Sequence, residues 1–248
     1  MSFAAAALAF APGLAIGSFL NVVAARVPLK RSIVSPGSAC MNCGHELSWY
    51  ENVPVASYLA LRGRCKGCGT KIGAVYPAVE LVTALLIAAS FLVFGLSGKA
   101  FVAAFFCAVL VTVSATDLSH RIVPNVVVLP AAAIVLVAMT ALYPSPEWAL
   151  GAFGASLFLF LAALAYPKGM GMGDVKLALL LGAMLGRTVP VALMVGMLAA
   201  LVPSIVLLVR HGSAARKMGI PFAPFLAFGG VFALFFGDDV LDAYLTLL

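Results

Sequence analysis

Residues 101–117 have the sequence FVAAFFCAVLVTVSATD, an apolar run that ends on an aspartate, Asp117. Residues 171–186, GMGDVKLALLLGAMLG, begin a second apolar run and carry an aspartate, Asp174, at its start. If such runs cross a membrane, a charged group at that depth is costly and usually functional. Both aspartates are therefore candidate site residues, because two carboxylates that face each other can act as acid and base for one water molecule.

The composition places these runs in a membrane protein. The 248 residues are 64% hydrophobic and 10% charged, with a mean hydropathy of +1.14, whereas soluble proteins are about 45–50% apolar and about 25% charged. The apolar runs recur and approach the ~20 residues needed to cross a bilayer. We expect an all-α polytopic membrane protein with about eight transmembrane helices. The expected spans are Phe3–Ala25, Pro77–Phe94, Lys99–Thr116, Val123–Leu142, Glu147–Tyr166, Val175–Gly186, Thr188–Val209 and Phe222–Phe236.

The basic residues predict the orientation of these spans. If the N-terminus is outside and the first span is retained, all but two of the 15 Lys and Arg residues lie inside. The inside set is Arg26, Lys30, Arg31, Arg62, Arg64, Lys66, Lys71, Arg121, Lys168, Lys176, Arg210, Arg216 and Lys217. This bias fits the positive-inside rule, and it requires a break at residues 186–188, without which the basic residues of 210–217 would lie outside. The net charge of +6 thus reflects membrane orientation, and no basic stripe with interleaved aromatic residues indicates nucleic-acid binding.

The number of spans between the two aspartates is even, which predicts that they lie on the same face of the membrane. Asp117 ends a span that enters the cytoplasm and Asp174 begins one that leaves it. Each aspartate alone could instead be a helix-end charge that reaches water, and Asp174 also suits a helix N-cap. The glycines before Asp174, in residues 168–173, allow close backbone approach and a mobile loop beside an extended peptide. His120 and Arg121 are interpreted as charges at the inner surface.

Two Cys-x2-Cys pairs lie in the segment between the first two spans. Cys40 and Cys43 form one pair and Cys65 and Cys68 the other. Thiolates at this spacing can converge on one tetrahedral Zn²⁺, and a cytoplasmic location disfavours disulfides. We expect structural zinc, because four thiolates leave no open coordination position.

Several residues around the cysteines have simple expected roles. Gly44, Gly67 and Gly69 suit tight turns of two zinc knuckles. His45 could be a ligand, although the four cysteines already complete the shell, and Cys107 is expected to be a small core residue. A loop of about 50 residues with few apolar positions needs such a metal to fold.

Three parts are expected: a first transmembrane helix over residues 1–25, a cytoplasmic zinc-binding domain over 26–76, and a transmembrane core over 77–248. Glu80 could face the site or cap its helix, with the cap favoured. Ser18 and Asn21 are expected to serve helix packing. The prolines of residues 219–225 predict a break at the start of the last span, which could line a cavity.

Together these motifs resemble the type IV prepilin peptidases, a family of GxGD intramembrane aspartyl proteases. The resemblance rests on an ordered set that runs over nearly the whole chain, and a lone GxGD motif would be weak. The set is Gly17-Ser18-Phe19-Leu20-Asn21-Val22, Arg26-Val27-Pro28, the four cysteines, Tyr76-Pro77 with Glu80, Asp117 with Ile122-Val123-Pro124-Asn125, Gly171-Met172-Gly173-Asp174 and Pro221-Phe222-Ala223-Pro224-Phe225.

The resemblance implies a bifunctional enzyme of the bacterial inner membrane. It would cut the short basic leader from type IV prepilins or type II secretion pseudopilins after a glycine, and then N-methylate the new terminus with S-adenosylmethionine. The catalytic pair would be Asp117 and Asp174, and the zinc ligands Cys40, Cys43, Cys65 and Cys68. The residues that bind the methyl donor are not indicated. One carboxylate would take a proton from water while the other, still protonated, donates toward the scissile carbonyl.

Two other classes of protein remain alternatives. A proton-coupled transporter would use the two aspartates as a relay, but it has no evident need for a cytosolic zinc module, and no internal symmetry is visible. A non-enzymatic membrane scaffold could dock partners through the zinc loop, but it leaves the Gly-Met-Gly-Asp motif unexplained.

Overall fold

The structure is a computed structural model that describes residues 2–166, 170–212 and 219–247. Three of the predicted inside charges, Lys168, Arg216 and Lys217, lie outside these ranges, as does Gly169. The described residues are helical, with two isolated β-bridges and no β-strand. The expected all-α membrane fold is therefore confirmed.

Eight long helices correspond to the eight predicted spans. They are α1 (Ser2–Arg26), α3 (Val75–Phe94), α4 (Gly98–His120), α5 (Asn125–Leu142), α6 (Glu147–Ala165), α7 (Met172–Leu185), α8 (Val189–His211) and α9 (Ala223–Leu245). The segment between α1 and α3 contains the short helix α2 (Ala56–Ala60) and the 3₁₀ turn η1 (Trp49–Asn52). A second 3₁₀ turn, η2 (Gly186–Thr188), separates α7 from α8.

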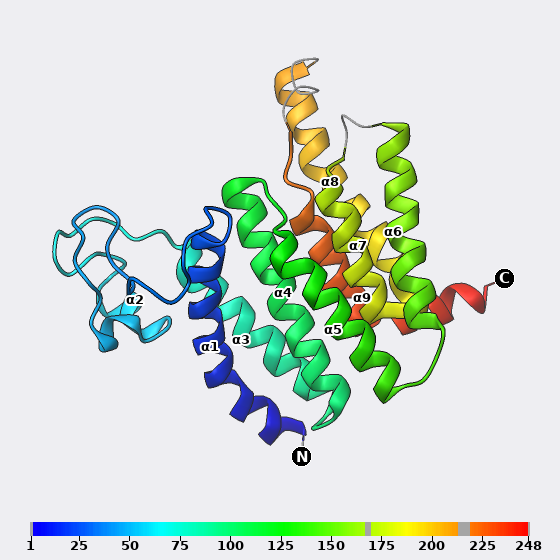
Figure 1. Ribbon diagram of the computed structural model, residues 1–248, viewed down its shortest axis with the longest axis horizontal. Helices are drawn as coiled ribbons and strands as arrows, with labels where there is room; N and C mark the ends of the chain where they lie inside the picture. Colours follow the sequence, from blue (N-terminus) through cyan, green and yellow to red (C-terminus); the bar gives the residue numbers. More distant parts are fainter. Residues whose placement is uncertain (1, 167–169, 213–218, 248) are drawn as a thin grey trace. The chain divides into compact units, whose positions relative to one another are not determined.

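By length and hydropathy alone, seven stretches of the described residues could cross a membrane, because Met172–His211 counts as one stretch of 40 residues. A straight helix of that length would be about 60 Å long, twice the thickness of a bilayer core. Gly186 interrupts it with φ +53°, and Figure 1 shows α7 and α8 running in opposite directions. The predicted break at residues 186–188 therefore separates two helices that run in opposite directions.

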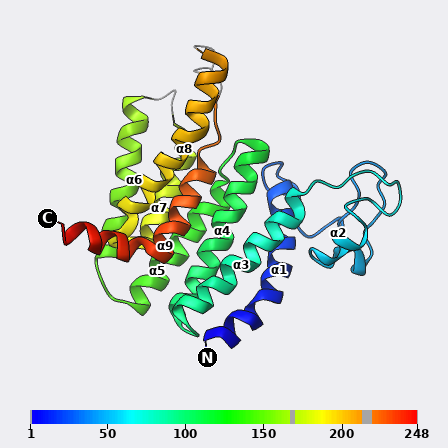
Figure 2. The ribbon, with the colours of Figure 1, turned by 180° about the vertical axis from the view of Figure 1, so that it is seen from behind.

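The chain forms two compact units, Met1–Ala115 and Thr116–Leu248. In the first unit α1 lies along α3 (Figure 2). A Cβ on Gly13 would come 2.8 Å from the Cα of Ala84, and one on Gly17 would come 2.6 Å from the Cα of Glu80. Glycines one turn apart thus let the two backbones meet, as small residues do between membrane helices.

In the second unit α7 is the central helix and packs against α5, α6 and α9. A Cβ on Gly182 of α7 would collide with the carbonyl oxygen of Gly151 on α6, so the two helices touch backbone to backbone. Almost every residue of α7 from Asp174 to Leu185 is buried. At 14 residues it is shorter than a lipid-exposed span, which is consistent with its protein surroundings.

Helix α9 continues nine residues past the predicted end of the last span at Phe236. Asp238 and Asp242 lie one turn apart on this extension, and Arg187 Nη2 is 2.8 Å from Oδ1 of Asp238 and 3.8 Å from Oδ1 of Asp242. Side chains four residues apart share one helix face. The predicted span Phe222–Phe236 therefore ends before the helix does.

The segment between α1 and α3 contains two Cys-x2-Cys knuckles with the same backbone hydrogen bonding. In one, Gly44 N–H donates to Cys40 O; in the other, Gly69 N–H donates to Cys65 O, each at 2.9 Å. Gly44 and Gly69 have φ of +73° and +69°, as expected for tight turns. Gly67 lies in the turn of the second knuckle, as predicted, and a Cβ there would also lie 3.2 Å from the Cβ of His45 in the opposite knuckle.

Candidate active site and metal centre

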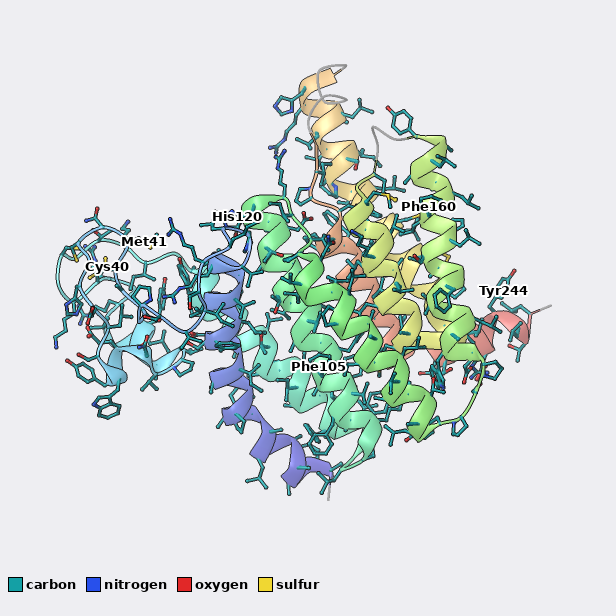
Figure 3. The ribbon with its side chains drawn as sticks, in the orientation of Figure 1. Cys40, Met41, Phe105, His120, Phe160 and Tyr244 are labelled. Atoms are coloured by element: carbon teal, nitrogen blue, oxygen red, sulfur yellow. The ribbon has the colours of Figure 1, made fainter. Side chains whose placement is uncertain are left out.

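Asp117 lies in the last turn of α4, three residues before His120, which Figure 3 labels at the end of that helix. Its side chain is buried, with 7% of the residue exposed. Oδ2 of Asp117 accepts a hydrogen bond from the backbone N–H of Ala223 at 3.1 Å. Ala223 is the first residue of α9, where the N–H groups lack partners within the helix and favour an anion.

This hydrogen bond explains the proline-rich entry into α9. The predicted break is confirmed, since residues 219–222 are not helical and the helix begins at Ala223. Because the helix begins at Ala223, the N–H of this residue has no partner within the helix. It donates instead to Asp117, which is 106 residues earlier in the sequence. The motif predicted the break but not the partner.

Asp174 lies in the first turn of α7, with 8% of the residue exposed. The prediction that it could be the N-cap is wrong: Gly171 is the N-cap, and the N–H of Asp174 donates to the carbonyl of Gly171 at 3.1 Å. The helix begins at Met172, three residues before the predicted start at Val175, so the carboxylate lies inside the first turn. A Cβ on Gly173 would come 2.7 Å from the Cβ of Val123, so glycine is needed there for close packing.

Both aspartates lie at the same end of the second unit, as the parity of the spans predicted. Figure 1 shows α4 and α6 ending, and α5 and α7 beginning, at this end. The carboxylates of Asp117 and Asp174 interact electrostatically with each other. Two buried carboxylates brought together in this way can share one proton and one water molecule.

A polar contact that the sequence analysis missed connects the start of α5 to the start of α7. Nζ of Lys176 donates to Oδ1 of Asn125 at 2.8 Å. Lys176 follows Asp174 by two residues, so this hydrogen bond holds the first turn of α7 beside α5. The sequence marked Lys176 only as an inside charge.

The four loop cysteines converge as predicted, and Figure 3 shows Cys40 among them. Their Sγ atoms all lie within 4.8 Å of one another. Sγ of Cys40 is 3.9 Å from Sγ of Cys68, and Sγ of Cys43 is 3.9 Å from Sγ of Cys65. A tetrahedral zinc with Zn–S bonds of 2.3 Å requires sulfurs about 3.8 Å apart, so the group fits Zn²⁺.

The surroundings of Cys68 favour its thiolate form, and the nearby His45 is engaged away from the cysteines. Hydrogen bonding to Thr70 lowers the pKa of Cys68 to about 6, and a metal ligand must be deprotonated. His45 is not in the shell, because its Nε2 lies 3.2 Å from Oε2 of Glu51. The backbone N–H of Ser48 and the contact with His45 both lower the pKa of Glu51, which therefore remains ionised.

The sequence favoured Glu80 as a cap of its own helix, but the structure does not place it in that role. Its Oε2 accepts a hydrogen bond from the backbone N–H of Val55 at 2.8 Å, and Val55 is the N-cap of α2. The carboxylate therefore connects α3 to the zinc-binding segment. Asn21 has the packing role expected for it, since its Nδ2 donates to the carbonyl of Tyr76 at 3.0 Å and joins α1 to α3. Cys107 is fully buried, as predicted.

Taken together, the fold and the sites define a multi-pass membrane protein with a buried pair of aspartates and a four-cysteine metal centre. Comparison with known families gives two matches. Residues 12–94 match the bacterial peptidase A24 N-terminal domain, and residues 104–209 match the type IV leader peptidase family.

Curated relatives match over almost the full length. The chain is 37% identical to a prepilin leader peptidase/N-methyltransferase of Bacillus subtilis, over 95% of this chain and 96% of the relative. It is 36% identical to a protein of the same name from Pseudomonas aeruginosa, over 94% and 91% respectively. A Myxococcus xanthus relative of that name is 50% identical over 49% of this chain and 36% of the relative. No solved structure matches the chain.

The chain therefore belongs to the type IV leader peptidase family. This confirms the resemblance drawn from the ordered motifs. The comparisons give no support to the transporter or scaffold alternatives.

Proposed function

We propose that this enzyme, a prepilin leader peptidase and N-methyltransferase, hydrolyses its peptide substrate with Asp117 and Asp174. The observation that carries the proposal is the pair of buried carboxylates at one end of the second unit, which interact with each other. Buried carboxylates without cationic partners are costly in a membrane protein unless they have a function. Among the described residues neither makes a salt bridge.

The two carboxylates have distinct surroundings, which suggest distinct roles. Asp117 accepts the N–H at the start of α9, a position that stabilises a negative charge. We assign it the general base, which takes a proton from the shared water as the oxygen attacks the scissile carbonyl carbon. Asp174, kept protonated beside it, donates its proton toward the carbonyl oxygen. Collapse of the tetrahedral intermediate breaks the C–N bond, and the leaving amine takes up a proton.

The substrates proposed for this chain are type IV prepilins and type II secretion pseudopilins, and the enzyme lies in the bacterial inner membrane. A basic leader at the cytoplasmic face would reach the aspartates, while the apolar helix of the substrate stays in the bilayer. Gly171, the N-cap of α7 just before Asp174, supports this placement, since an extended peptide can lie close to a glycine backbone. No role for nucleic acid is proposed.

The second activity transfers a methyl group to the new N-terminus. S-adenosylmethionine supplies this methyl group from its sulfonium; the C–S bond breaks, a C–N bond forms, and the amine loses a proton. The residues that would hold the structural Zn²⁺ are Cys40, Cys43, Cys65 and Cys68, whose closed shell supports the fold of the loop and leaves no position for hydrolysis. We propose residues 1–25 as the first transmembrane helix, 26–76 as the zinc-binding domain and 77–248 as the peptidase core.

The test uses purified protein in detergent with a prepilin-like peptide. Wild-type protein should shorten the peptide, and with S-adenosylmethionine the product should gain the mass of a methyl group. Asp117→Asn and Asp174→Asn should each lower cleavage by at least about 100-fold, the size of a general acid–base contribution. Asp239→Asn, an aspartate at the far end of α9, is the matched control and should cleave normally. Full cleavage by either of the first two variants rules out the pair.

A further inference from the structure

The first unit contains a cavity of about 450 Å³ that the peptidase mechanism does not use. It is lined by the end of α1, the start of α3 and the zinc-binding segment, including Asn21, Arg26, Cys40, Glu51, Tyr76 and Glu80. Its volume is in the range of about 300–1,000 Å³ found for sites that bind drug-sized ligands. A few polar groups among apolar walls are typical of such sites.

Among the residues that line the cavity, Glu80 has a carboxylate oxygen that could still bind a ligand. It is buried, with 8% exposed, and makes no salt bridge with any described residue. Its Oε2 accepts the N–H of Val55, and its Oε1 has no hydrogen bond within the described part of the chain. Buried glutamates are rarely found without a partner. No fully enclosed side-chain oxygen of the described residues lacks a partner, so Oε1 is not fully enclosed, and Glu80 is one of the residues that line the cavity.

Three of the other charged groups that line this cavity are already engaged, whereas Lys71 is exposed and makes no ion pair with any described residue. Glu51 is paired with His45 and accepts the N–H of Ser48. Nη1 and Nη2 of Arg26 donate to the carbonyls of Ser32 and Gly37. Nζ of Lys66 donates to the hydroxyl of Tyr50 at 2.7 Å. The carboxylate of Glu80 is thus available to a cation that enters from outside.

We propose that this cavity binds S-adenosylmethionine and that Glu80 holds its cationic methionyl end. The proposal rests on the methyltransferase activity proposed above, which requires a drug-sized cationic donor. The proposal also connects the zinc-binding segment to methyl transfer, because Cys40 and its knuckle form one wall of the cavity.

The first test measures binding of S-adenosylmethionine to the purified zinc-loaded protein by calorimetry. Glu80→Gln keeps the shape and the acceptor for Val55 but removes the charge, and affinity should fall about tenfold or more, the worth of a charged hydrogen bond. Glu46→Gln removes the same charge from an exposed residue of the same segment that does not line the cavity, and should bind normally. Glu80→Gln should keep its zinc and its leader cleavage. Unchanged affinity in Glu80→Gln would overturn the proposal.

A second test needs no variant and covers the case in which Glu80→Gln does not fold. Ultraviolet crosslinking of radiolabelled S-adenosylmethionine to the wild-type protein should label peptides from residues 18–26, 38–47 or 70–80. Label found only in peptides after residue 116 would refute the site. Failure of the proposed function would give a different result: the wild-type protein would add no methyl group to a cleaved peptide.

Discussion

At the scale of single residues, the two sites differ in how their charged groups are surrounded. Asp117 and Asp174 are buried carboxylates that make no salt bridge with any described residue, and they can exchange protons with a water molecule. The four cysteines instead form a closed set around a metal position, with cross-knuckle Sγ distances of 3.9 Å. The first arrangement suits chemistry and the second suits stability.

The metal centre gives a prediction at this scale. Cys43→Ser removes one thiolate of four, so the zinc content of the purified protein, measured by atomic emission, should fall clearly below that of the wild type. Cys107→Ala is the matched control, because that thiol is buried in α4 away from the cluster, and its zinc content should not change.

His45→Ala completes the test of the ligand set. His45 pairs with Glu51 and not with the metal position, so zinc content should be retained. Loss of zinc in His45→Ala, or normal zinc in Cys43→Ser, would contradict the four-cysteine assignment.

At the scale of elements, the closest contact is between α6 and α7. A methyl group on Gly182 would collide with the carbonyl oxygen of Gly151 and would lie 2.5 Å from the amide nitrogen of Ala152. These are backbone atoms, which cannot move aside without moving a helix. Since α7 carries Asp174 in its first turn, this contact also positions the site.

Gly182→Ala should therefore destabilise the protein by about 1–3 kcal/mol, the usual range for overpacking, and lower its unfolding temperature in detergent. Gly154→Ala, in α6 with no atom near the added methyl group, should be neutral or slightly stabilising because alanine favours a helix. Equal unfolding temperatures for the two variants would show that the helices do not touch as described.

At the scale of the whole molecule, the membrane orientation is the main prediction. Ser119 is exposed at the end of α4 beside the aspartates, and Ser145 lies between α5 and α6 at the opposite end of the second unit. With the aspartates at the cytoplasmic face, a membrane-impermeant maleimide should label Ser145→Cys in intact spheroplasts. It should label Ser119→Cys only after permeabilisation. The reverse pattern would contradict the orientation.

Much of the fold was predictable from the sequence, because membrane spans depend on local composition. Apolar length located all eight helices, and the excess of basic residues on one side required the break at Gly186, where the backbone turns with φ +53°. Prediction failed where a boundary depends on a distant partner. The end of α9 was misplaced because Asp238 and Asp242 pair with Arg187, which is about 50 residues earlier.

The sequence by itself determined the class of fold, the zinc ligands and the candidate aspartates. These follow from periodicity, from fixed short spacings and from the high cost of charge in lipid, all of which are local properties. Only the tertiary structure decided that Ala223 donates to Asp117, that Gly171 rather than Asp174 caps α7, and that Glu80 joins the zinc segment. Such contacts form between residues far apart in the chain, and their geometry depends on how the helices pack. The same packing brings Asp117 and Asp174 to one end of the second unit, where their carboxylates interact.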